Sequence, residues 1–313
     1  MDINMQMLAD AVDKAAQASS NSPVSMGITK DENIQSKTVK EQTFLEFLEQ
    51  KNRTRDVNTT NVSFYEEDGG STAEFITELG DIPSHTAKTF TEVTDSTKTI
   101  AYPVQVSMKA QEGIDVIDLR TNLITDGYVK VNNLVDKTLL QGNATNSNYE
   151  FNRITKDVTE IDNEQEPITE QVVKDALQAC HDAGGSPDCI VTDAFVANQL
   201  DDLVSPFIRY NNVMEMALGH KVSTFRSIDG SFIPILVDNN VPKTAASGQN
   251  LERHNLVVLD SSTVDVAYQR RPSLIQLAQT NLATNEAIYS WVTAYNTAKW
   301  KSRVIKNISP DSE

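Results

Sequence analysis

Cysteine and histidine are scarce in this chain of 313 residues, which contains two cysteines and four histidines. Cys180 and Cys189 make no disulfide framework, and such a composition is typical of proteins made in a reducing, intracellular compartment. Cys180-His181 and Cys189 leave the four-ligand set of a zinc site incomplete, and His220 and His254 have no matching spacing. We therefore expect both thiols to be buried structural residues and predict no metal site.

Basic residues are outnumbered, because 27 Lys and Arg face 44 Asp and Glu, for a net charge of -17. A nucleic-acid surface needs clustered Lys and Arg, so this balance argues against one. Two local basic groups are present, Arg270-Arg271 and the run KWKSRVIK over residues 299–306. The pair could meet DNA or form an intersubunit salt bridge with Glu66, Glu67 or Glu78. The run is more typical of a solvated strand edge or a subunit contact.

Long hydrophobic runs are also missing. No stretch approaches the roughly 18 apolar residues of a membrane span, and the first residues lack the basic and apolar regions of a secretory signal. Catalytic patterns are absent too: Asp201 and Asp202 are adjacent on a predicted helix and so diverge, and no serine sits in a nucleophile elbow. We predict no catalytic, cofactor-binding or metal residues, no cofactor, and a protein that is not an enzyme.

Apolar residues make up 39% of the chain and aromatic residues 6%, which favours a thin or extended body that buries apolar surface against copies of itself. Residues 1–60 are polar and turn-rich apart from one apolar helical face, and we predict an extended arm that gains order by lying on something else. That face consists of Phe44, Leu45, Phe47 and Leu48.

Residues 61–100 predict a long hairpin. Short β-prone runs alternate with turn signals, and the middle of the segment is rich in Thr, Ser and Glu. A hairpin of that composition cannot build its own core, and an isolated hairpin is marginal in water. The hairpin is therefore either flexible or supported by a neighbouring subunit. The β-prone runs are residues 62–65, 74–77, 89–94 and 97–106.

A long helix is predicted over residues 115–141, before the stop signal Gly142-Asn143. Its apolar residues recur at the spacing of one helical face, and three leucines widen that face. At 1.5 Å per residue the helix would span roughly 40 Å, more than most compact domains need. The face comprises Ile117, Ile124, Tyr128, Val131, Val135 and Leu139, widened by Leu123, Leu134 and Leu140.

Helix, strand and helix alternate between residues 168 and 203, and further apolar strands follow at 232–238 and 255–260. Thr169 is a candidate N-cap for the first helix, and Gly184-Gly185 ends it. This alternation predicts a small α/β domain. The C-terminal segments 264–279 and 286–308 read as extended strands.

The order of these segments resembles the major capsid proteins of tailed double-stranded DNA bacteriophages, which share the Hong Kong 97-like capsid fold. ITELGDIPSHTAKTFTEVTDSTKTIAYPVQVSMKAQE looks like the E-loop of that family and its return, and LVDKTLLQGN is similar to the end of its spine helix. ITEQVVKDALQACHDAGGSPDCIVTDAFVANQLDDL resembles its axial-domain helix, strand and helix, and FRSIDGSFIPILVDNNVP with NLVVLDSSTVDVAYQRRPSLIQLA its final axial strand and return. The resemblance covers residues from about 40 to 308.

The resemblance implies an α+β fold. It divides the chain into an N-terminal arm (1–60), an E-loop hairpin and its base (61–100), a peripheral domain (101–164 and 256–313) with the spine helix, and an α/β axial domain (165–255). In that family the hairpin lies across the neighbouring subunit. Lys88 and Lys98 lie in the hairpin, but nothing in the sequence identifies a partner Asn or a catalytic Glu for a covalent crosslink.

The function implied is a major capsid protein that self-assembles into an icosahedral shell around packaged viral DNA. Its partners would be copies of itself in hexamers and pentamers, with scaffold, portal and decoration proteins as further candidates, and it would enclose DNA without sequence-specific binding and bind no membrane. We expect assembly in the host cytoplasm and residence in the virion. Two alternatives stay open: an encapsulin-type shell or other phage structural protein, and a soluble α/β ligand-binding module.

Overall fold

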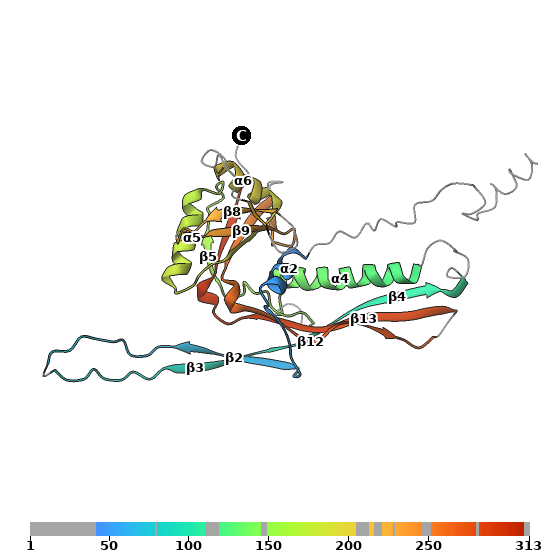
Figure 1. The fold of residues 1–313 in the computed structure, drawn as a ribbon, viewed down its shortest axis with the longest axis horizontal. Coiled ribbons are helices and arrows are strands. Elements are labelled where there is room, and N and C mark those ends of the chain that lie inside the picture. Colours follow the sequence, from blue (N-terminus) through green and yellow to red (C-terminus); the bar gives the residue numbers. More distant parts are fainter. Residues whose placement is uncertain are drawn as a thin grey trace, which may run out of the picture.

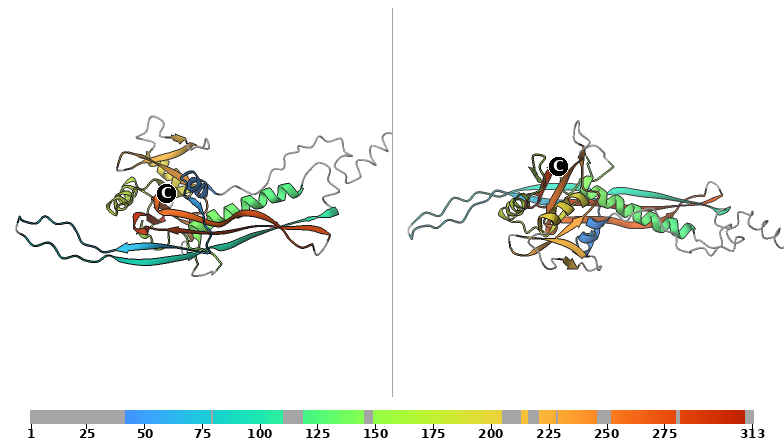
Figure 2. Two further views of the ribbon diagram at one scale, coloured as in Figure 1. Left: turned by 60° about the horizontal axis from the view of Figure 1, so that its bottom comes forward. Right: turned by 90° about the horizontal axis from the view of Figure 1, so that it is seen from above.

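The structure is a computed structural model, and it describes residues 42–78, 80–109, 119–144, 149–204, 213–215, 221–227, 229–245, 252–279 and 282–309. Figure 1 shows three parts. The first part is a long flat sheet with one helix lying along it, and the second is a rounder body of helices and strands near one end of that sheet. The third is a hairpin that projects past the body, on the side away from the long flat sheet (Figures 1 and 2).

The long flat sheet has the strand order β1–β12–β13–β4. β1 is parallel to β12, whereas β13 is antiparallel to both of its neighbours, β12 and β4. β12 and β13 confirm the extended C-terminal segments expected from the sequence. The bounds are β1 (Thr54–Asp56), β4 (Lys98–Ser107), β12 (Val264–Gln276) and β13 (Ala283–Asn296).

Helix α4 (Leu119–Gln141) lies along this sheet and is the predicted long helix. Its 23 residues span roughly 35 Å. Val131 packs with strand residues of β4 and β13, and Ile124 and Tyr128 lie against the same cluster. Farther along, Val135, Leu139 and Leu140 enter the main core. The predicted apolar face is confirmed at these positions, and Ile117 lies outside the described residues.

Two of the three leucines that we expected to widen this face do not do so. Leu123 and Leu134 are exposed, because the sheet covers only one stripe of the helix. Gly142 ends the helix as predicted, but not through a left-handed conformation. A Cβ at this position would collide with the carbonyl oxygens of Phe151 and Thr138, so glycine is required by close backbone approach.

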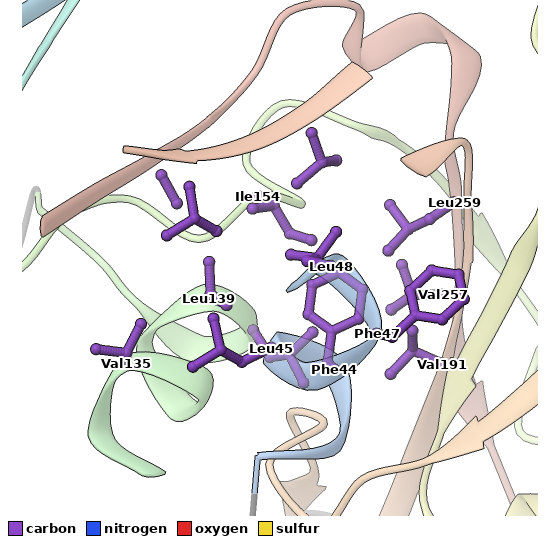
Figure 3. Close-up of a cluster of buried hydrophobic side chains, with 14 of the residues drawn as sticks. Phe44, Leu45, Phe47, Leu48, Val135, Leu139, Ile154, Val191, Val257 and Leu259 are labelled. Atoms are coloured by element: carbon purple, nitrogen blue, oxygen red, sulfur yellow. The ribbon is translucent and has the colours of Figure 1, made fainter. Parts of the chain in front are cut away.

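Helix α2 (Thr43–Gln50) corrects the prediction of an arm over residues 1–60. Its four apolar residues are all buried in the main core of their own chain, and β1 joins the long flat sheet. The apolar face therefore packs between α4 and the α/β body of its own chain, and burying it requires no other subunit. Residues 1–41 lie outside the described residues. Figure 3 shows the helix packed among Val135, Leu139, Ile154, Val191, Val257 and Leu259.

The α/β body is built on a sheet of order β5–β14–β11–β6–β9–β8–β7, with β10 paired to β11. Thr169 caps the first helix as predicted, since its Oγ1 accepts from Val172 N at 3.4 Å. The bounds are α5 (Glu170–Asp182), α6 (Ala194–Val204), β5 (Thr159–Asp162), β6 (Cys189–Thr192), β7 (Val213–Glu215), β8 (Lys221–Arg226), β9 (Phe232–Val237), β10 (Thr244–Ala245), β11 (Glu252–Leu259) and β14 (Arg303–Ile308).

Strand pairing in this body crosses the boundaries that the sequence suggested for an axial domain at 165–255. β5 and β14 lie outside that range, and β11 spans its end, yet all three belong to the same sheet as β6 and β9. β14 pairs antiparallel with β11 and parallel with β5. Segments before and after the predicted range therefore complete this sheet. Pairing between segments so distant in sequence leaves no local signal in composition.

Candidate assembly surfaces

The hairpin formed by β2 (Asn61–Asp68) and β3 (Thr89–Ser96) is the most exposed part of the described chain. The strands pair antiparallel from Asn61↔Ser96 to Asp68↔Thr89. The predicted strand at 74–77 does not form, because residues 69–88 carry no ladder. Figure 1 shows this segment extending far beyond the α/β body.

Apolar side chains in this projecting segment have no cover within the chain. Phe75 is fully exposed, Ile82 is 87% exposed, and Ile76 is also exposed, as is Phe90 in the adjoining strand β3. The hydrogen bonds and ion pairs of the described residues in this segment are local: Thr86 N donates to Ser71 Oγ at 2.6 Å, and Lys88 pairs with Glu67. Burying each such side chain stabilises a protein by about 1.5–3 kcal/mol. The segment therefore presents apolar surface that is not buried within the subunit and that a binding partner could bury.

The base of the hairpin, in contrast, is firmly attached to the long flat sheet. Phe64 stacks on Tyr295 with 5.4 Å between ring centroids, and the Arg55 guanidinium lies 5.2 Å from the centroid of the same ring. Val62 is buried in that cluster, and Glu66 pairs with Lys299 at 3.3 Å. The sheet therefore fixes the direction in which the hairpin projects.

The hairpin is also strongly acidic. Residues 61–100 contain eight carboxylates and two lysines, Lys88 and Lys98. Glu66 and Glu67 are paired to lysines of their own chain, whereas Glu78 is exposed near the end of the hairpin. The eight carboxylates are Glu66, Glu67, Asp68, Glu74, Glu78, Asp81, Glu92 and Asp95.

The two predicted basic groups lie apart from each other and interact within the chain. Arg270 stands 4.9 Å over the Tyr289 ring on the long flat sheet, and Arg271 Nε donates to Asp56 Oδ1 at 2.8 Å. In the run 299–306, Lys306 pairs with Glu160 at 2.5 Å, and Arg303 donates to three backbone carbonyls. These pairings support structural roles over a phosphate-binding patch.

The residues considered for metal binding or catalysis are dispersed or buried. Cys180 and Cys189 are free and buried, and burial raises the pKa of the Cys180 thiol to about 11. His254 contacts Asp193, whose Oδ1 also caps α6 by accepting from Val196 N at 3.1 Å. Asp201 is exposed on α6, and His220 lies outside the described residues.

Across the described ranges, no group of three or more His, Cys, Asp or Glu side chains is placed to hold a metal ion. None of the helices in that part of the chain combines the length and apolar composition that a membrane crossing requires.

One polar cluster was not anticipated from the sequence. Asp136 lies in the apolar stripe of α4 between Val135 and Leu139, and it is buried against Asp238 and Asn240 at the end of β9. An acidic residue inside a helix's apolar stripe is the signal that could have revealed it, because buried carboxyl groups need partners.

Comparisons with known proteins agree with this architecture. The family model "SU10 major capsid protein" matches residues 31–309. No curated protein matches the chain significantly in sequence. The structure is similar to the capsid protein of cyanophage A-1(L), with a TM-score of 0.68 at 12% identity over 91% of this chain and 98% of that one.

Two other solved structures show the same fold. The holo-SrpI encapsulin complex from Synechococcus elongatus PCC 7942 matches with a TM-score of 0.68 at 11% identity, over 96% of this chain and 97% of that one. The capsid of an empty GTA particle matches with a TM-score of 0.66 at 10% identity, over 92% and 97%. The family match favours the capsid function over the encapsulin-type shell and the ligand-binding module. The chain belongs to the SU10 major capsid protein family, and it is a structural protein of the phage virion that forms the icosahedral capsid shell.

Proposed function

We propose that the shell consists of hexameric and pentameric rings in which the hairpin of each copy lies across the next copy, as an E-loop. The observation that carries this proposal is the uncovered apolar segment 69–88, which stands out from a rigidly attached base. Closed rings need heterologous contacts, in which one surface of a subunit meets a different surface of its neighbour. A projecting hairpin supplies one such surface.

The same proposal assigns roles to the other parts. The long flat sheet with α4 would be the peripheral domain, in which the helix stiffens a thin wall. The α/β body would be the axial domain, whose copies meet around the centre of each ring. Scaffold, portal and decoration proteins would be further partners of the shell.

The charge of the chain suits a wall that encloses DNA without gripping it. A net charge of -17 repels phosphate at long range, and the run 299–306 is engaged by carboxylates and carbonyls of its own chain. We therefore propose that the shell contains the DNA without sequence-specific contacts.

Shortening the hairpin tests the assembly role. Asp68 and Thr89 are register partners, so residues 69–88 can be replaced by Asn-Gly, which closes a two-residue turn. Because this segment contributes nothing to the described core, the variant should keep the thermal stability of the unassembled subunit. It should fail to form closed shells in negative-stain electron microscopy and mass photometry.

A second variant separates the effect of the apolar side chains from the effect of hairpin length. The double variant Phe75→Ser and Ile82→Ser keeps the hairpin but removes its two most exposed apolar side chains. It should assemble at a higher protein concentration than the wild type does, and Thr72→Ser, an exposed polar change in the same segment, should have no effect. Normal shells from the shortened chain would refute the assignment of the hairpin.

A further inference from the structure

Two buried carboxyl groups meet where α2, the spine helix α4 and the α/β body come together. Asp136 lies near the end of α4 and is 0% exposed, and Asp238, which follows β9 directly, is 2% exposed. Neither forms an ion pair with Lys or Arg in the described part of the chain. Such a pair is unusual, because each isolated buried charge costs several kcal/mol.

Asp136 holds three segments together through hydrogen bonds. Its Oδ1 accepts from Leu45 N at 2.7 Å, in the first turn of α2, and its Oδ2 accepts from Asn240 Nδ2 at 3.0 Å. The N-cap residue of α2, Gln42, makes no side-chain capping bond, so Asp136 caps this helix from a distant part of the sequence. Gln141, at the end of α4, donates to Asn240 O at 2.8 Å.

Asp238 completes the cluster from the other side. Its Oδ1 accepts from Asn240 N at 2.8 Å, and its backbone N–H donates to Thr192 O of β6 at 2.8 Å. Its Oδ2 is buried and accepts no hydrogen bond from any described residue, and its side chain interacts with the carboxyl group of Asp136. A carboxyl group that keeps its proton can donate to such an oxygen, whereas a carboxylate cannot.

We propose that Asp136 and Asp238 share one proton and so form a latch that fastens α2 and the turn after β9 to the end of the spine helix. Removal of this proton to water leaves two adjacent carboxylates without a cation, and their repulsion opens the latch. The latch is a conformational control that goes beyond the building of a shell, and it does not depend on the ring geometry proposed above.

Several titratable and charged groups surround the pair. Burial, and then the neighbouring Asp238, raise the pKa of Asp136 to about 9. Tyr268 of β12 interacts with both Asp136 and Glu49 of α2. Glu46 of α2 and Lys137 of α4 are further charged residues on the two helices that Asp136 joins. Asp193 follows Thr192, whose carbonyl accepts from Asp238 N, and it contacts Lys243 and His254. Burial raises the pKa of Tyr268 above its ordinary value, so this phenol stays neutral when the latch opens.

The direction of the pH effect follows from proton binding. An aspartate in the unfolded chain loses its proton near pH ~3.9, whereas the folded pair keeps one until the pH approaches about 9. Between these values the folded state binds more protons, so stability falls as the pH rises. The contribution is fully present below the unfolded pKa and is lost as the pH passes through the folded one.

The test compares thermal unfolding of the unassembled full chain between pH 6 and pH 9. Asp136→Asn keeps the shape and the acceptor for Leu45 N, replaces the acceptor for Asn240 Nδ2 by an N–H donor, and removes the titration. Over this range the melting temperature of the wild type should fall by ~5 °C or more beyond the fall of the variant. Asp202→Asn is the matched control, because it makes the same charge change on the exposed side of α6. It should follow the wild-type profile.

Two further measurements keep the proposal testable if Asp136→Asn does not fold. Asp238→Asn should flatten the same profile while leaving the acceptor for Leu45 N in place. Infrared spectroscopy of the wild type should show a protonated-carboxyl band at pH 7 that disappears by pH 10. Parallel pH profiles in the variants and the wild type, or absence of that band at pH 7, would overturn the latch.

A local readout should accompany the loss of the proton. Lys51 and Arg53 follow α2 directly, so trypsin should cut the wild type there several-fold faster than Asp136→Asn when both are digested at pH 9. Equal cutting rates would show that α2 is not released, and would also contradict the proposal.

Discussion

Arg120 in the first turn of α4 holds Glu286 of β13 through two hydrogen bonds, from Nε to Oε2 at 3.0 Å and from Nη2 to Oε1 at 2.5 Å. Glu286 is 3% exposed, whereas Arg120 is partly solvated. This contact ties the start of the helix to the strand beneath it, far from the core at the helix's other end.

Removing the guanidinium should destabilise the subunit. Arg120→Ala leaves a buried carboxylate without this charged donor pair, which should cost about 2 kcal/mol after allowance for the solvated side of Arg120. Urea denaturation of the unassembled subunit measures the loss. Lys174→Ala, which breaks an exposed pair with Glu170, is the control and should change stability by less than ~0.5 kcal/mol. Equal losses of unfolding free energy in the two variants would show that the Arg120–Glu286 contact contributes no more than an exposed ion pair.

Gly127 shows why a glycine persists in the middle of a long helix. A Cβ there would lie 2.6 Å from Ile288 Cδ1 and 2.8 Å from Tyr102 Cδ1. Gly127→Ala should therefore destabilise the subunit by about 1–2 kcal/mol, although alanine favours helix by about 1 kcal/mol. Chemical denaturation measures this change.

A second substitution, at Ile288, should compensate for part of the loss caused by Gly127→Ala. Ile288→Val removes the Cδ1 atom that the new methyl group would meet. The double variant should thus be more stable than the sum of the two single losses predicts, which a double-mutant cycle reports directly. Simple additivity would show that the helix moves away instead of clashing.

The two cysteines should be chemically inert in the folded chain. Burial raises the pKa of Cys180 to about 11 and that of Cys189 well above its ordinary value, so at pH 8 almost no reactive thiolate is present. An aromatic disulfide reagent should label neither thiol in native protein and both after denaturation in urea at the same pH. Stoichiometric labelling of native protein at pH 8 would refute the buried assignment.

The local elements were largely predictable because their signals are local. The 3.6-residue periodicity of Val131, Val135 and Leu139 identified the long helix α4, and Thr169 identified the start of α5. The same reasoning failed at Leu123 and Leu134, since helix periodicity says which residues share a side but not how wide the covering sheet is.

The sequence by itself determined the character of this protein: scarce histidine and cysteine, an acidic hairpin without a core, one long helix and the capsid-like order of segments. The tertiary structure alone decided where distant segments meet. It brought α2 into its own core, completed the α/β sheet with β5, β11 and β14, and placed Asp136 beside Asp238. The reason is physical: helix and turn preferences act over a few residues, whereas strand pairing and burial depend on contacts between segments a hundred residues apart.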